Sequence, residues 1–189
     1  MSKANAQVRQ PRQYPYTYPV NAEPLLAEIA RAMHELRFDA VLIGNAAAAL
    51  QGAPVTTVDF DFMFRKTTLN MRKLKALAVA LGAAVLRPYY PASDLYRIVR
   101  DDDGLQIDFM ATIHGVRSFA GLRARATVVE FGGAAVRVAS LGDIIRSKKA
   151  AGRPRDLAVL EVLEKTHEEA TQARAGTRRA AARKRPRAR

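Results

Sequence analysis

The sequence alternates between apolar and polar positions over residues 56–64, TTVDFDFMF. Successive side chains of a β-strand point to opposite faces of the sheet. The alternation therefore predicts a strand that buries its valine and phenylalanine side chains on one face and projects Asp59 and Asp61 together from the other.

Hydrophobic spacing predicts further elements on both sides of this strand. A buried strand, FDAVLIG, ends at Gly44, and a short helix, NAAAALQG, follows it with Asn45 as its cap. Helices are expected over 23–37, 68–81, 141–152 and 154–170, and strands over 83–87, 95–100, 105–111, 126–131 and 135–139. The acidic run Asp101–Asp103 before Gly104 is typical of a solvated hairpin turn. This order predicts an α+β (or α/β) fold, a sheet of mixed strand direction with helices packed on one face.

The chain divides into four parts by composition. Residues 1–22 are expected to form an irregular basic arm, 23–140 the core, 141–170 C-terminal helices packed on that core, and 171–189 a basic tail. The tail has almost no apolar residue larger than alanine, so we expect it to be disordered when free.

Charge is concentrated at the two ends of the chain. The net charge is +13, but residues 171–189 carry eight basic and no acidic residues and residues 1–20 carry three basic and none acidic. Basic tails are common in proteins that bind nucleic acid, although codon bias toward alanine and arginine would give the same composition. The sequence contains no cysteine and no apolar run of the ~20 residues that span a bilayer. Together with the lack of a signal peptide in the first twenty residues, this predicts a cytoplasmic protein without membrane contact.

A third aspartate, Asp108, lies between Ile107 and Phe109 in the predicted strand LQIDFMA. A charge is costly in such an apolar setting, and clustered carboxylates repel one another unless a cation lies between them. Mg²⁺ prefers oxygen ligands of this kind and carries substrate phosphates on its open positions. The aspartates thus predict metal-dependent phosphoryl or nucleotidyl transfer, although paired outward aspartates alone could also mark a half-exposed sheet edge.

The order of these features resembles the DNA polymerase β-type nucleotidyltransferase superfamily: a strand ending at Gly44-Asn45, a short helix, paired strand aspartates and a later strand-borne aspartate. The segment LGDIIRSKKAAGRPRDLAVLEVL is similar to the helical end of small prokaryotic members, among them the abortive-infection (AbiEii-like) toxins. The resemblance covers roughly residues 25–165. It implies transfer of NMP from an NTP such as ATP to an acceptor hydroxyl.

The resemblance also implies a role for each acidic residue. Asp59 and Asp61 would bridge two Mg²⁺ ions, with Mn²⁺ as the alternative, and would hold the nucleotide phosphates. Asp108 would complete the acceptor-side metal and help to take the acceptor proton.

Five further residues are implied in nucleotide binding. The turn at Gly44 and Asn45 would place backbone N–H groups at the triphosphate, and Lys148 would offer it a point charge. Arg153 and Asp156 would clamp either the substrate or each other. The last three have structural alternatives, since Lys148 could face solvent and Arg153 with Asp156 could be a local pair at the start of a helix.

The acceptor stays open at this stage. The basic ends favour RNA, with a tRNA 3′ end as the most economical choice, and the toxin-like relatives suggest one half of a toxin–antitoxin or phage-defence pair with a cognate antitoxin. A protein hydroxyl and a small molecule such as an aminoglycoside are the other acceptor classes. The hypothesis from a different class is a catalytically silent module that keeps the fold to bind RNA or a partner.

Overall fold

The computed structural model describes residues 22–57, 59–86, 94–131 and 133–183. Residues 1–21 of the predicted N-terminal arm, Val58 of the alternating strand and the last six residues of the tail lie outside these ranges. None of the described helices is both long and hydrophobic enough to cross a membrane.

Seven strands of the described residues form a single mixed sheet, as the sequence predicts. They are β1 (Ala40–Ile43), β2 (Phe60–Phe64), β3 (Ala84–Leu86), β4 (Leu95–Arg100), β5 (Leu105–Met110), β6 (Thr127–Phe131) and β7 (Ala134–Val138), in the order β3-β4-β5-β2-β1-β7-β6. Strand β2 runs parallel to β5 and antiparallel to β1, and β1 runs parallel to β7. The remaining neighbours pair antiparallel, as hairpins require.

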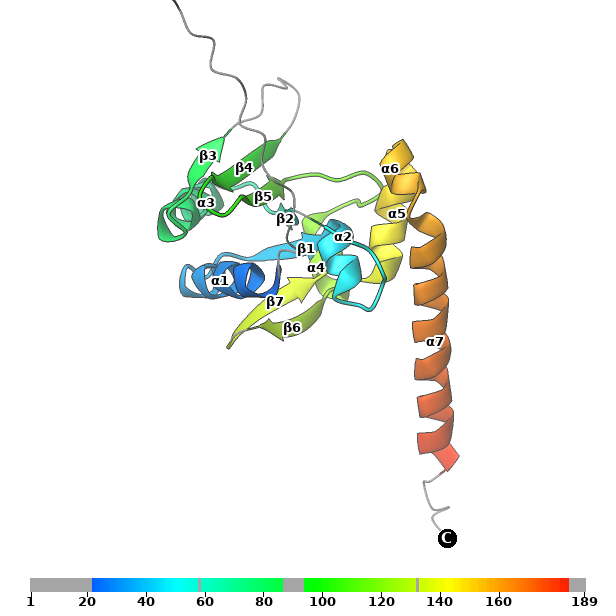
Figure 1. The fold of residues 1–189 in the computed structure, drawn as a ribbon. Helices are drawn as coiled ribbons and strands as arrows, with labels where there is room; N and C mark the ends of the chain where they lie inside the picture. The colour runs from blue at the N-terminus through cyan, green and yellow to red at the C-terminus, as the bar shows by residue number, and fades with distance from the viewer. Residues whose placement is uncertain (1–21, 58, 87–93, 132, 184–189) are drawn as a thin grey trace, which may run out of the picture.

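Helices lie on both sides of this sheet. Helices α1 (Ala22–Glu35) and α3 (Thr68–Ala80) lie on one side, and α2 (Gly44–Ala49), α5 (Leu141–Ala151), α6 (Pro154–Leu157) and α7 (Leu160–Arg183) lie on the other (Figure 1). The prediction that helices pack on one face of the sheet therefore holds for α1 and α3 only. The sequence reading also missed α4 (Phe119–Arg125), a seven-residue helix too short to show a clear apolar period, which begins with Ser118 as its N-cap.

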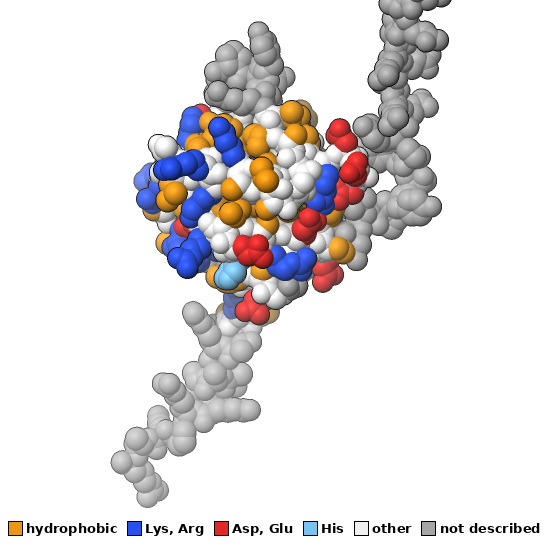
Figure 2. Space-filling view, turned by 90° about the vertical axis from the view of Figure 1, so that its left-hand side faces the viewer, with side chains coloured by type: hydrophobic (Ala, Val, Ile, Leu, Met, Phe, Trp, Pro, Cys, Tyr) orange, Lys and Arg blue, Asp and Glu red, His pale blue; other side chains and the backbone are white. Residues whose placement is uncertain are grey.

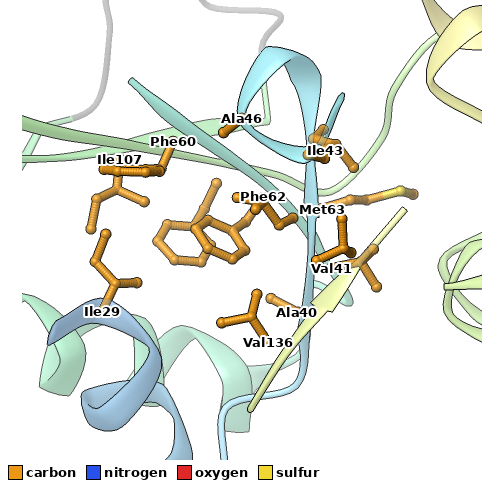
Figure 3. Close-up of a cluster of buried hydrophobic side chains, with 14 of the residues drawn as sticks. Ile29, Ala40, Val41, Ile43, Ala46, Phe60, Phe62, Met63, Ile107 and Val136 are labelled. Atoms are coloured by element: carbon orange, nitrogen blue, oxygen red, sulfur yellow. The ribbon is translucent and has the colours of Figure 1, made fainter. Parts of the chain in front are cut away.

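The core lies between the sheet and helix α1, and the alternating strand β2 runs through it. Phe62 and Phe109 stack with their ring centroids 5.3 Å apart, and both are fully buried. Ile29 of α1 is also fully buried and lies on the same side of the sheet as Phe62 (Figure 3). Burying one phenylalanine side chain contributes roughly 1.5–3 kcal/mol. Because these rings fix β2, they also fix Asp61, which projects from the opposite face.

The C-terminal region is more helical than the sequence predicts. A short helix, α6, is separate from α7, whereas a single helix over 154–170 was expected. Helix α7 continues to Arg183, well into the tail predicted to be disordered. Alanine and arginine are strong helix formers, so the composition that cannot form a core can still extend a helix that is already nucleated.

Candidate active site

Sheet pairing brings the predicted aspartates together. Asp61 of β2 and Asp108 of β5 are register partners in a parallel pair, and Asp59 immediately precedes β2. One carboxylate oxygen from each of the three residues lies within 4.8 Å of the others. Asp108 is 6% exposed, so its charge is almost wholly withdrawn from water.

The electrostatics of Asp61 favour a bound cation. Burial, and then repulsion by the carboxylates of Asp59 and Asp108, raise the pKa of Asp61 to about 7, while Lys148 and Arg153 oppose that rise. A carboxyl group with so high a pKa is ionised at neutral pH only at a cost that a nearby positive charge would remove. A cluster of oxygen donors with this deficit of positive charge suits a hard divalent cation such as Mg²⁺.

The turn between β1 and α2 lies directly against this cluster. Gly44 has φ +68°, a left-handed conformation that other residues adopt at a cost. A Cβ atom at Gly44 would lie 2.4 Å from Oδ2 of Asp61. Glycine is thus required twice, for its backbone angle and for the room it leaves for the carboxylate.

Asn45 does not cap the short helix, and that prediction is wrong. Helix α2 has Ile43 at its N-cap and no side-chain cap hydrogen bond. The Asn45 side chain instead donates from Nδ2 to the carbonyl of Thr56, 3.2 Å away, which ties the turn to the segment entering β2. Its Oδ1 is buried without a hydrogen-bond partner in the described part of the chain.

Asp59 is held by the residue two positions before it. The Thr57 hydroxyl donates to the backbone carbonyl of Asp59 at 2.7 Å and lies 3.1 Å from Asp59 Oδ1. The Asp59 carboxylate is therefore oriented although it lies outside the strand, where the sheet ladder no longer fixes it.

Sequence reasoning missed Arg97, which contacts the third carboxylate. Its Nε and Nη2 each donate to one oxygen of Asp108 at 2.7 Å, a bidentate pair. The hydrogen bonds to Asp108 raise the pKa of Arg97 further. A cation bound by Asp108 would have to share at least one carboxylate oxygen with this guanidinium. The hairpin turn after Arg100 could have revealed the pair, because it places residue 97 opposite residue 108.

The basic residues predicted to bind nucleotide meet around Asp156. Lys148 Nζ lies 3.0 Å from Asp156 Oδ1, and Arg153 Nε lies 2.5 Å from Oδ2. These hydrogen bonds outweigh burial and lower the pKa of Asp156, although burial is the largest single influence on it. The Lys148 side chain is only 11% exposed, so it is not the solvent-facing lysine of the alternative interpretation. Arg153 and Asp156 pair with each other.

All eight predicted site residues line one cleft of about 610 Å³. A volume of this size is typical of small-molecule and cofactor sites. The triad and the glycine turn lie on its sheet side, and Lys148, Arg153 and Asp156 come from α5, α6 and the short link between them. The cleft therefore brings the anionic triad together with the cationic side chains of Lys148 and Arg153.

Comparison with known proteins identifies the fold. No family model and no curated protein matches the sequence. The structure resembles the antibiotic-resistance factor ANT(2″)-Ia, solved with adenylyl-2″-tobramycin, with TM-score 0.54 and 17% identity over 86% of this chain and 99% of that one. It also resembles the lincomycin-bound lincosamide adenylyltransferase LnuA, with TM-score 0.55 and 11% identity over 75% of this chain and 96% of that one. The candidate nucleotidyltransferase TM1012 from Thermotoga maritima gives TM-score 0.55 and 18% identity over 78% and 96%.

The chain therefore has the nucleotidyltransferase fold, as its sequence motif implies. The mixed sheet carries the acidic triad on the face opposite the phenylalanine core. The finer similarity to the AbiEii-like toxins stays a prediction.

Proposed function

We propose that this protein is a Mg²⁺-dependent nucleotidyltransferase that moves NMP from an NTP to an acceptor hydroxyl. The observation that carries the proposal is the convergence of Asp59, Asp61 and Asp108 within 4.8 Å in a cleft that Lys148 and Arg153 also line. The metal, held by these carboxylates, would supply Lewis-acid activation of the triphosphate and charge for the transferring phosphoryl group.

The protein's own residues bind and orient the substrates. Lys148 and Arg153, both fixed by Asp156, supply positive charge for the nucleotide phosphates. The turn at Gly44 lets backbone N–H groups approach the triphosphate, and its lack of a side chain keeps Asp61 in place. The catalytically silent alternative has no use for three close, partly buried carboxylates that repel one another.

Nucleotide binding is tested by thermal stabilisation with each NTP in the presence and absence of Mg²⁺. We expect the NTP to raise the Tm above its value with Mg²⁺ alone, and we expect this further rise to require Mg²⁺ and to be lost in Asp61→Asn. The exposed hairpin variant Asp101→Asn is the matched control and should behave as the wild type does. If no NTP shifts the wild type, or if Asp61→Asn shifts equally, the enzyme proposal fails and the binding-module hypothesis replaces it.

We infer that RNA is the acceptor, with a tRNA 3′ end as the first substrate to test, because residues 171–189 carry eight basic and no acidic residues and α7 includes this segment as far as Arg183. Neighbours with small-molecule ligands, tobramycin and lincomycin, favour a small-molecule hydroxyl as the second candidate. Each α-labelled NTP is to be incubated with total RNA, or with aminoglycosides and lincosamides, and the products resolved. Label on RNA that is lost in Asp59→Ala supports the first acceptor, and label only on an antibiotic supports the second. A toxin role with a cognate antitoxin follows only if RNA is labelled.

A further inference from the structure

A second groove of about 440 Å³ lies beside the catalytic cleft. Three arginines line it together with two glycines and one serine: Arg117, Arg125, Arg146, Gly115, Gly121 and Ser118. The lining contains no acidic side chain among the described residues. No backbone or side chain of this groove belongs to the predicted nucleotide site.

One buried carboxylate orients two of these arginines. Asp143, 2% exposed, accepts from Arg125 Nη2 at 2.8 Å and from Arg146 Nη1 at 2.7 Å. It also accepts from the hydroxyl of Ser140, the N-cap of α5. The side chains of Arg125 and Arg146 are nevertheless 49% and 55% exposed. Asp143 therefore orients them while they stay accessible from the groove.

Glycine and the local charge keep this groove open and positive. A Cβ atom at Gly115 would lie 2.7 Å from the carbonyl of Arg146, so the loop approaches α5 as closely as a glycine allows. Arg117 is exposed and has no salt bridge among the described residues. With two arginines sharing one carboxylate, the groove keeps a net charge of about +2, the footprint of a polyanion site.

The groove borders the catalytic cleft. Asp143, which holds the arginines, also lines the cleft, and His114 lines the cleft next to Gly115 of the groove. A chain whose end occupied the cleft could therefore reach the three arginines over a short distance.

We propose that this arginine groove binds the phosphodiester backbone of an RNA acceptor whose 3′-terminal hydroxyl lies in the cleft. Guanidinium groups pair with phosphate oxygens in a bidentate fork, and fixed arginines lose less freedom on binding than free ones. The triphosphate of the NTP is a second source of phosphate, but it must lie at the aspartate triad, across Asp143 from the groove. This inference rests on the proposed nucleotidyltransferase function.

The test measures binding of a fluorescein-labelled single-stranded RNA by anisotropy, with the full-length protein in EDTA and without NTP. We expect Arg117→Ala/Arg146→Ala to bind about tenfold more weakly at 50 mM salt and to reduce the slope of log K against log salt by about 1.4, since two phosphate contacts are lost. Arg117→Ala alone removes no observed ion pair and should reproduce half of the change in slope even if the double variant folds poorly.

The control removes two charges from another surface. Lysine and arginine side chains gather along one side of the face formed by α1 and α3 (Figure 2). Arg72→Ala/Lys75→Ala, both exposed on α3, makes the same change in net charge there and should leave RNA affinity near that of the wild type. The basic tail is common to every variant, so differences between them report the groove. Equal loss in the control and groove variants would show general charge attraction and overturn the proposal.

Two further arms separate this inference from the proposed function. Binding of a fluorescent ATP analogue with Mg²⁺ should be unchanged in Arg117→Ala/Arg146→Ala, and a loss there with RNA binding intact would assign the groove to the nucleotide. RNA binding that depends on the groove, together with no nucleotidyl transfer to any acceptor, would refute the catalytic proposal and keep the groove. Transfer to a small molecule, together with RNA binding that does not change in the Arg117 and Arg146 variants, would support the catalytic proposal and refute the proposed role of the groove.

Discussion

Replacing Asp61 with asparagine should stabilise the metal-free protein. The pKa of Asp61 is raised from 3.8 to about 7 in the fold, chiefly by burial and then by Asp59 and Asp108. One pKa unit corresponds to about 1.36 kcal/mol, so the ionised carboxylate costs the folded state about 4 kcal/mol when the pH exceeds both values. Asparagine has nearly the same shape and no charge, so Asp61→Asn removes this cost.

The sign of the effect fixes its pH dependence. Below pH 3.8 the carboxyl group is protonated in both the folded and unfolded chain, and the penalty is absent. Between pH 3.8 and 7 the unfolded chain releases the proton first, so the stability of the wild type falls as the pH rises. We expect Asp61→Asn to be more stable than the wild type by about 4 kcal/mol at pH 8 and by only about 1.5 kcal/mol at pH 5.

Urea denaturation followed by circular dichroism in EDTA, at both pH values, measures this gap. Asp101→Asn, on the exposed hairpin, should stay within about 0.5 kcal/mol of the wild type. Added Mg²⁺ should stabilise the wild type and leave Asp61→Asn unchanged, which reverses their order at saturating metal. A variant no more stable than the wild type at pH 8, or a gap that does not narrow at pH 5, would show that Asp61 is not the strained carboxylate described above.

Three other substitutions probe the remaining parts of the site. Gly44→Ala should lower stability by at least about 1 kcal/mol because of the positive φ, and it should abolish Mg²⁺ stabilisation because the added Cβ displaces Asp61. Thermal melts with and without Mg²⁺ measure both effects, and an unchanged response to Mg²⁺ would contradict the steric argument. Arg97→Met should cost about 3 kcal/mol in EDTA by leaving Asp108 buried without its partner, and Mg²⁺ should restore part of that loss; equal costs with and without metal in urea titrations would show no competition for the carboxylate. Lys148→Met should weaken NTP binding about tenfold in fluorescence titrations, and unchanged affinity would assign Lys148 to structure alone.

The sequence predicted those parts of the site that repeat a local pattern. Alternation in residues 56–64 placed Asp61 on the face opposite the core, and the apolar surroundings of Asp108 marked it as a charge with a partner. Each of these features is a property of one strand, so neighbouring residues suffice to reveal it.

What the sequence did not reveal depends on pairing between segments. Arg97 is an ordinary arginine in an alternating strand until the hairpin places it across from Asp108. The serine at position 140 and the acid at 143 have the spacing of a helix-start capping pair, which could have indicated Asp143. Its partner Arg146 lies three residues further along the same helix, but its partner Arg125 comes from α4 and only the fold brings it there. Asn45 was assigned as a cap because asparagine is common at the start of a helix. Its actual hydrogen bond reaches the distant carbonyl of Thr56, which the local sequence does not reveal.

The parallel pairing of β2 with β5 has a consequence for how the site forms during folding. Asp61 and Asp108 are neighbours in space, but the connection between them contains α3, β3 and β4. Such a contact closes a long loop, so we expect it to form after the local hairpin of β4 and β5. The triad does not exist in any partly folded chain that lacks this pairing, so a nascent or misfolded copy has no assembled metal site. The appearance of Mg²⁺ affinity during refolding should therefore report completion of the central sheet.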